Sequence, residues 1–310
     1  MAGFLETVAN FLLWVAQNIA LAPYHLFLAV TNPSAWLNWG DREALVRFIY
    51  YGGSVEFFFV VFTEFLVITA LGMAWRREIL WTAVRWLEGI ANAVGRFAAW
   101  AGLLMVLQQV MIVFLQRIFR VAEIQLGPLG TAFTQDLSWW GEELKLYNAL
   151  VVTLCVSYTF VQGGHVRVDL FYSSAKFRTK KLIDMFGSLV FMLPAITLTY
   201  LYAWFFMWRH LVVPNPSASG TLDRMLMQSR VLRWNVETIG FSPNGFNAYF
   251  IFKVLIVAFC VLVFLHAIAF FWRSYLEWLE GEESADKYLD RDPIGDAAEA
   301  IEHKIHSGST

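Results

Sequence analysis

Charged residues are scarce in this chain of 310 residues: Asp, Glu, Lys and Arg make up 15% of it, whereas hydrophobic residues make up 58%. A soluble domain carries roughly a quarter of its residues as charges, so the composition excludes an ordinary soluble protein. The charges that are present cluster between apolar stretches. Several of these stretches reach the length of about 20 residues at which a helix crosses a bilayer. We therefore expect an all-α, polytopic membrane bundle.

Further absences narrow the function. A net charge of −2 gives no reason to expect a nucleic-acid partner. The two cysteines, Cys155 and Cys260, lie inside apolar runs, where cysteine behaves as a small buried hydrophobic residue. The start, MAGFLETVANF, lacks the basic region of a secretory signal. The sequence shows no Cys/His cluster with ligand spacing, no nucleophile elbow and no phosphate-binding glycine loop. We expect no enzyme, metal site or cofactor.

Long apolar runs, by contrast, are abundant, and we interpret six of them as membrane spans. They cover residues 8–30, 49–74, 97–116, 144–162, 183–208 and 247–272. The first run is free of charge but contains Asn, Gln, His and Pro23, so a kinked span and an interfacial helix both fit it. The 14 Trp and 28 Phe suit the aromatic belts at the two membrane interfaces.

Lys and Arg are far denser in 75–96 and 163–182 than in the other loops, which places these two loops and both termini in the cytoplasm. Within the first of them, residues 79–95 alternate with helical period. Leu80 and Val84 mark an apolar face, whereas Glu88 and Asn92 mark a polar one. This pattern predicts an amphipathic helix on the membrane surface. Residues 281–310 form an acidic tail that we expect to be mobile and cytoplasmic.

The second basic loop contains the stretch QGGHVRVDLFY, residues 162–172. Its two glycines can end the preceding helix. After them His165, Arg167 and Asp169 alternate with apolar residues, so an extended segment would turn its polar groups to one side. An ordinary positive-inside loop is the alternative interpretation.

The order of motifs resembles the small membrane subunit of tripartite ATP-independent periplasmic (TRAP) transporters. The motifs are FLQRIFR at 114–120, WWGEEL at 139–144, GGHVRVD within 162–172, and ETIGFSPNGF at 237–246 leading into a span. The resemblance covers a four-helix core at 97–280. Residues 1–96 would then be an N-terminal extension with one or two spans and a linker helix.

This resemblance implies a scaffold without a transport site of its own. Its partners would be a large sodium-coupled transport subunit, a periplasmic protein that delivers organic acids, and the lipids of the bacterial inner membrane. It also implies that the matching residues contact partners. These are Trp139, Trp140, Glu142, Glu143, His165, Arg167, Asp169 and Lys253.

Physical arguments bear on three of these positions. Glu142 and Glu143 are expected in the first turn of a helix, where the helix dipole favours carboxylates, so capping is the simpler role. Lys253 lies near the outer end of the last span, where a lysine can extend its ammonium to the interface.

Two carboxylates, Glu56 and Glu64, fall inside the second apolar run. At 100° per residue they lie about 80° apart around a helix, so both can face one side. Glu64 is expected near the middle of the bilayer, where a charge faces protein rather than lipid. We favour a contact between helices over ion translocation.

Two rival functions are open. A haem b cytochrome subunit would need paired histidines at matching depth, and only His25 and His266 lie within spans. A free-standing channel or carrier would show broken helices at matching places in two halves, a pattern that this sequence lacks.

Overall fold

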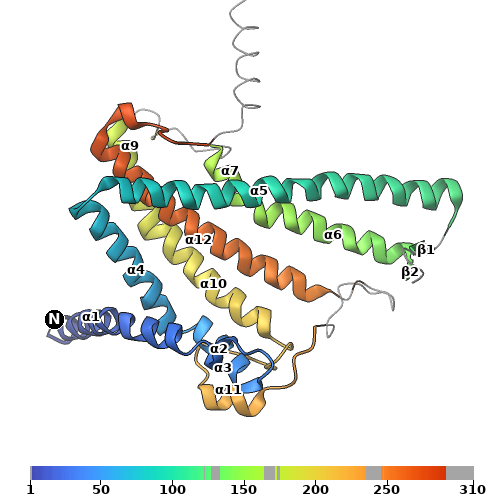
Figure 1. Cartoon of the computed structure of the whole chain (residues 1–310), viewed down its shortest axis with the longest axis horizontal. Helices are drawn as coiled ribbons and strands as arrows, with labels where there is room; N and C mark the ends of the chain where they lie inside the picture. The colour runs from blue at the N-terminus through green and yellow to red at the C-terminus, as the bar shows by residue number, and fades with distance from the viewer. Residues whose placement is uncertain are drawn as a thin grey trace, which may run out of the picture.

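The structure, a computed structural model, describes residues 2–121, 123–126, 133–163, 172, 175–234, 246 and 248–290. Over these residues it is almost entirely helical (Figure 1). Six of its helices are long and apolar enough to cross a membrane. The expected all-α bundle is therefore confirmed, the number of such helices matches the six predicted spans, and the chain is a multi-pass membrane protein.

The first helices are α1 (Ala2–Thr31), α2 (Ser34–Leu37), α3 (Arg42–Gly52) and α4 (Val55–Ala74). The apolar run that was expected to cross as one span from residue 49 is divided here, so the predicted start of that span is wrong. Gly53 follows the end of α3 as its cap. Ser54 then caps α4, because its Oγ accepts a hydrogen bond from the backbone N–H of Phe57 at 3.2 Å.

The next helix, α5 (Arg77–Val113), continues as a π-helix over Phe114–Phe119. The helix predicted at 79–95 is present, but it does not end at residue 95, because this segment and the following span form one helix of 43 residues. Its position on the membrane surface stays a prediction. At 1.5 Å per residue that helix is about 64 Å long. Since the hydrocarbon core of a bilayer is about 30 Å thick, only about half of α5 can lie in lipid at a steep angle.

A short hairpin follows α5, with β1 (Glu123–Leu126) antiparallel to β2 (Phe133–Asp136). The remaining elements are α6 (Leu137–Leu154), α7 (Val156–Val161), α9 (Phe177–Phe186), η3 (Gly187–Met192), α10 (Leu193–Trp208), α11 (Leu222–Gln228), α12 (Tyr249–Glu280) and η4 (Glu282–Ser284). Helix α12 is the centre of the bundle, since α5, α6, α9 and α10 all pack against it (Figure 1).

Two apolar clusters lie along α12. One joins α3 and α10 to its first half, and there the indole N–H of Trp204 donates to the carbonyl oxygen of Ile49 at 2.8 Å. The other joins α4 and α5 to its second half, where the Trp272 indole donates to Thr69 Oγ1 at 2.8 Å. The buried indoles thus hold neighbouring helices in register.

Polar groups of α5, α9, α12 and the chain after α12 meet at one end of the bundle. The guanidinium of Arg273 contacts Glu88 of α5, and Glu277 pairs with Lys181 of α9. Asp290 accepts hydrogen bonds from Arg96 and from other residues of this end. The segments assigned to the cytoplasm by their charge therefore come together, although which end faces the cytoplasm stays a prediction.

The segment after α12 begins as a packed structure rather than a mobile tail. Tyr288 stacks edge-on against Trp81 at 5.7 Å, and Asn92 donates to the carbonyl oxygen of Asp290 at 2.9 Å. The expectation of a mobile tail is therefore wrong for residues 281–290. Its later part, 291–310, lies outside the described residues.

Candidate functional site

The two glutamates of the tryptophan–glutamate motif bind other parts of this chain. Glu142 Oε2 accepts a hydrogen bond from the backbone N–H of Phe246 at 2.9 Å. Glu143 Oε2 accepts one from Gln108 Nε2 of α5 at 2.8 Å. Their expected place in the first turn of a helix is wrong, because α6 already begins at Leu137 and its first turn holds no acidic residue. The pair therefore joins α6 to its neighbours rather than capping it.

The tryptophans of the same motif contribute rings to this junction. The Trp139 ring centroid lies 5.2 Å from that of Trp140 and 5.4 Å from that of Phe246. Both tryptophans are half-buried. The start of α6 is thus tied to the residues just before α12, and a further contact of this motif with another protein stays a prediction.

Lys253 lies inside the bundle, not at its surface. Its side chain is only 1% exposed, and its ammonium donates to the carbonyl oxygen of Arg209 at 3.3 Å. The ammonium also lies 4.7 Å from the ring centroid of Phe206 and 5.6 Å from that of Tyr249. The expected extension toward the interface is wrong, because α10 and the chain after it enclose the side chain.

Three predicted partner residues, His165, Arg167 and Asp169, lie outside the described residues. Of the stretch that contains them, Gln162 is described. Its side-chain amide donates to the carbonyl oxygen of Asp290 at 3.0 Å. The end of α7 therefore lies beside the segment that follows α12.

Glu64 has the most unusual surroundings of the predicted site residues. It lies midway along α4, a span of 20 residues with mean hydropathy 2.2, and its side chain is exposed. It forms no hydrogen bond or ion pair with any residue that the structure describes. The predicted contact with another helix of this chain is therefore not present in that part of the molecule. A membrane carboxylate on an outer face calls for a polar neighbour, and the described residues of this chain do not supply one.

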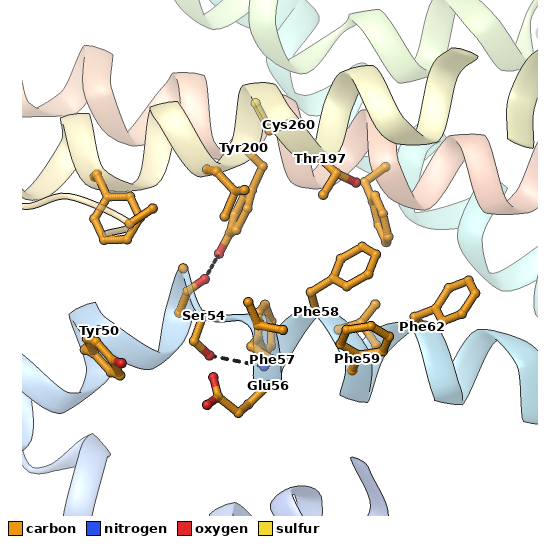
Figure 2. Close-up of a pocket in the computed structure, with 18 of the residues that line it drawn as sticks. Tyr50, Ser54, Glu56, Phe57, Phe58, Phe59, Phe62, Thr197, Tyr200 and Cys260 are labelled. Carbon is orange, nitrogen blue, oxygen red and sulfur yellow. Dashed lines mark hydrogen bonds between the residues drawn. The ribbon is translucent and has the colours of Figure 1, made fainter. Parts of the chain in front are cut away.

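A cavity of about 910 Å³ lies where α3 meets α4 (Figure 2). Side chains of α1, α4, α10 and α12 line it. The Tyr200 hydroxyl donates to the carbonyl oxygen of Gly52 at 3.0 Å, which holds α10 against the α3–α4 junction. Most of the lining is aromatic or aliphatic, so the cavity suits an apolar occupant along most of its length.

The polar side of this cavity centres on Glu56, in the first turn of α4. Figure 2 shows its side chain pointing away from Tyr200 and Cys260. The carboxylate is half-buried and forms no hydrogen bond or ion pair with a described residue. Burial, and then the nearby Glu56 charge, raises the pKa of the Tyr50 phenol, so this phenol stays a hydrogen-bond donor at neutral pH. The cavity therefore offers a negatively charged hydrogen-bond acceptor, the Glu56 carboxylate, beside a neutral donor, the Tyr50 hydroxyl.

Sequence reasoning missed the ionic cluster around Arg273. Its Nε and Nη2 atoms each donate to one oxygen of Glu88 at 2.6 Å, and its Nη1 lies 3.4 Å from Glu277 Oε1. Glu88 is 5% exposed and Glu277 is 1% exposed. Glu88 was assigned to a solvent-facing side of a surface helix, which is wrong because α12 covers that side. One signal was available: an arginine four residues before a glutamate at the end of an apolar run.

The two histidines considered for haem lie in different settings. His266 of α12 stacks on Phe160 at 5.0 Å and on Phe270 at 6.2 Å. His25 lies on α1 beside Tyr24, and α1 packs mainly on α4. These contacts give no support to a haem site.

Three comparisons with known proteins, by family model, by curated sequence and by solved structure, returned no match. The site residues and their surroundings are therefore the basis for assigning a function.

Proposed function

We propose that this chain is the small, scaffolding membrane subunit of a binding-protein-dependent, sodium-coupled carrier of organic acids in the bacterial inner membrane. The observation that carries the proposal is the exposed carboxylate of Glu64 in the middle of α4. The order of motifs in 97–280 resembles that of the TRAP small subunit. This resemblance indicates the kind of transporter complex to which the chain would belong.

Glu64 favours a protein neighbour over lipid on energetic grounds. Insertion of a carboxylate at the centre of a membrane helix costs about 2.5–3.5 kcal/mol of free energy. Such residues nearly always face protein or a water-filled cavity. Because no described residue of this chain covers Glu64, we assign the covering group to another polypeptide. A basic or hydrogen-bond-donating side chain of a partner helix fits best.

The face around Glu64 suits a helix of that kind. Phe57 and Leu71 lie one heptad before and after it, and Val67 lies three residues beyond; all three are exposed. At 100° per residue these positions fall within about 60° of Glu64 around α4. An apolar stripe with one carboxylate at its centre can therefore run along a partner helix.

The rest of the molecule suits a passive support. Glu142 ties α6 to the chain before α12, and Arg273 ties α5 to α12. These cross-links join helices that a moving carrier would have to separate. In addition, only 6% of the α1 window and 17% of the α4 window are buried, so the extension has free area for lipid or a partner.

Affinity purification from native membranes in mild detergent tests this proposal. We expect the wild-type chain to bring down a larger polytopic membrane protein. Glu64→Gln should lower its recovery about tenfold or more, since loss of one charge of a desolvated pair costs about 2–5 kcal/mol. Glu56→Gln, the same change on the same helix, is the matched control and should leave recovery unchanged.

Either of two results would contradict the proposal. The first is that no second membrane protein accompanies the wild-type chain. The second is that Glu64→Gln and wild type recover the partner equally well.

A further inference from the structure

The cavity at the α3–α4 junction changes in character along its length. At one end it is lined by Tyr50, Ser54 and Glu56. At the other end it is lined by side chains such as Phe62, Phe264 and Leu265. Its volume of about 910 Å³ falls in the range of roughly 300–1,000 Å³ that is usual for ligand sites. The cavity therefore suits an elongated amphiphile with one polar end.

This change in polarity follows depth in the membrane. Ser54 and Glu56 stand at the start of the α4 span, whereas Phe62 lies about 1.7 turns beyond Glu56. At 1.5 Å per residue, the step from Glu56 to Phe62 covers about 9 Å along the helix axis. A phospholipid with its headgroup at the membrane interface would place its polar and apolar parts in the same order.

The charge at the polar end selects the headgroup. Glu56 is half-buried beside the cavity and no described residue neutralises it, so it favours a cation. The hydroxyls of Tyr50 and Ser54 are donors that suit a phosphate. From this charge complementarity we propose that the cavity binds a phospholipid whose headgroup carries a primary ammonium, as in phosphatidylethanolamine, with the ammonium on Glu56 and an acyl chain along α4 and α12.

The cavity is reachable from the bilayer. It is bounded on one side by Phe11 and Trp14 of α1, which are 59% and 45% exposed. On α12 it is bounded by Val261, which is 43% exposed. A lipid can therefore enter laterally without unfolding the bundle.

Native mass spectrometry of the full chain in mild detergent tests this site. The probes are phosphatidylethanolamine and phosphatidylglycerol with identical acyl chains, added separately and together. We expect the wild type to retain a single phosphatidylethanolamine, with a preference of about tenfold over phosphatidylglycerol, the factor that corresponds to about 1.4 kcal/mol. Glu56→Gln should abolish the preference. Glu64→Gln, outside the cavity, should keep it, so the lipid site and the proposed partner contact can fail separately.

A second pair of variants tests the apolar end. Val261→Trp fills the cavity and should abolish retention of the lipid. Val254→Trp places the same side chain at a position of similar exposure, 41%, on the same helix but outside the cavity. It should retain the lipid as the wild type does, and thermal unfolding of both variants checks that they fold.

Three results would overturn the assignment. One is equal retention of the two lipids by the wild type, and another is an unchanged preference in Glu56→Gln. The third is capture of a protein rather than a lipid by a photoreactive residue at position 261 in native membranes.

Discussion

Arg273 holds three parts of the fold together through one guanidinium. It donates two hydrogen bonds to Glu88 of α5, and its Nη1 donates to the carbonyl oxygen of Lys287 beyond α12 at 3.1 Å. The guanidinium carbon of Arg273 also lies 5.6 Å from the ring centroid of Trp81. Because Arg273 and Glu88 are both buried, removing one of them leaves an unpaired charge out of water.

We predict that Arg273→Met lowers the free energy of unfolding by about 3–5 kcal/mol, the usual cost of breaking a buried ion pair. The double variant Glu88→Gln/Arg273→Met should lose less than the sum of its two single variants, since it leaves no lone charge. Unfolding by SDS titration of the purified chain measures both effects. Additive losses would show that the pair does not act as a unit.

At the scale of elements, α5 packs closely against α7 at Gly95. A Cβ built on Gly95 would lie 2.1 Å from the Cβ of Tyr158 and 2.6 Å from its Cγ. These are the first atoms of the side chain and cannot swing away. Glycine at this position therefore sets the separation of the two helices.

Gly95→Ala should destabilise the chain by about 1–3 kcal/mol, the range for overpacking in a core. Gly102 provides the control one heptad later on α5, because a Cβ there would meet only Val151 Cγ2 at 3.9 Å. Gly102→Ala should be neutral or stabilise by up to about 1 kcal/mol through its higher helix propensity. Thermal unfolding followed by circular dichroism compares the two, and equal effects would contradict the close contact.

The elements were predictable where the signal was local. Apolar length identified the six long helices, since a span needs no information from elsewhere in the chain. Their ends were less predictable, because Gly53 and Ser54 interrupt an apolar run without a change in hydropathy. Helix α5 was divided in two for a different reason: its polar residues indicated water, whereas Glu88 pairs with Arg273 of α12 and Asn92 donates to Asp290.

The contacts of the site residues could not be predicted in this way. They join residues far apart in the sequence, and no local pattern reveals such pairs. Glu88 and Arg273 are 185 positions apart, and the carboxylate of Glu142 finds a backbone N–H 104 positions away. Lys253 lies in an apolar run where extension toward the interface was the simplest expectation. Only the packing of α10 shows that its ammonium is enclosed.

At the scale of the whole molecule, the chain forms a rigid helical scaffold. Helix α12 forms the axis of this scaffold. The ionic cluster around Arg273 and the α6–α12 junction stabilise its two ends. Residues 1–96 contain two carboxylates, Glu56 and Glu64, for which different roles are proposed. We propose that Glu56 serves a lipid site and that Glu64 faces a partner. Neither assignment requires a substrate to pass through this chain.

The most direct test of this account is solute uptake by vesicles that contain the purified chain alone or the chain together with the membrane protein that co-purifies with it. With a sodium gradient, an organic acid and its periplasmic binding protein, we predict uptake only when both membrane proteins are present. Sodium-driven uptake by vesicles containing this chain alone would contradict the account.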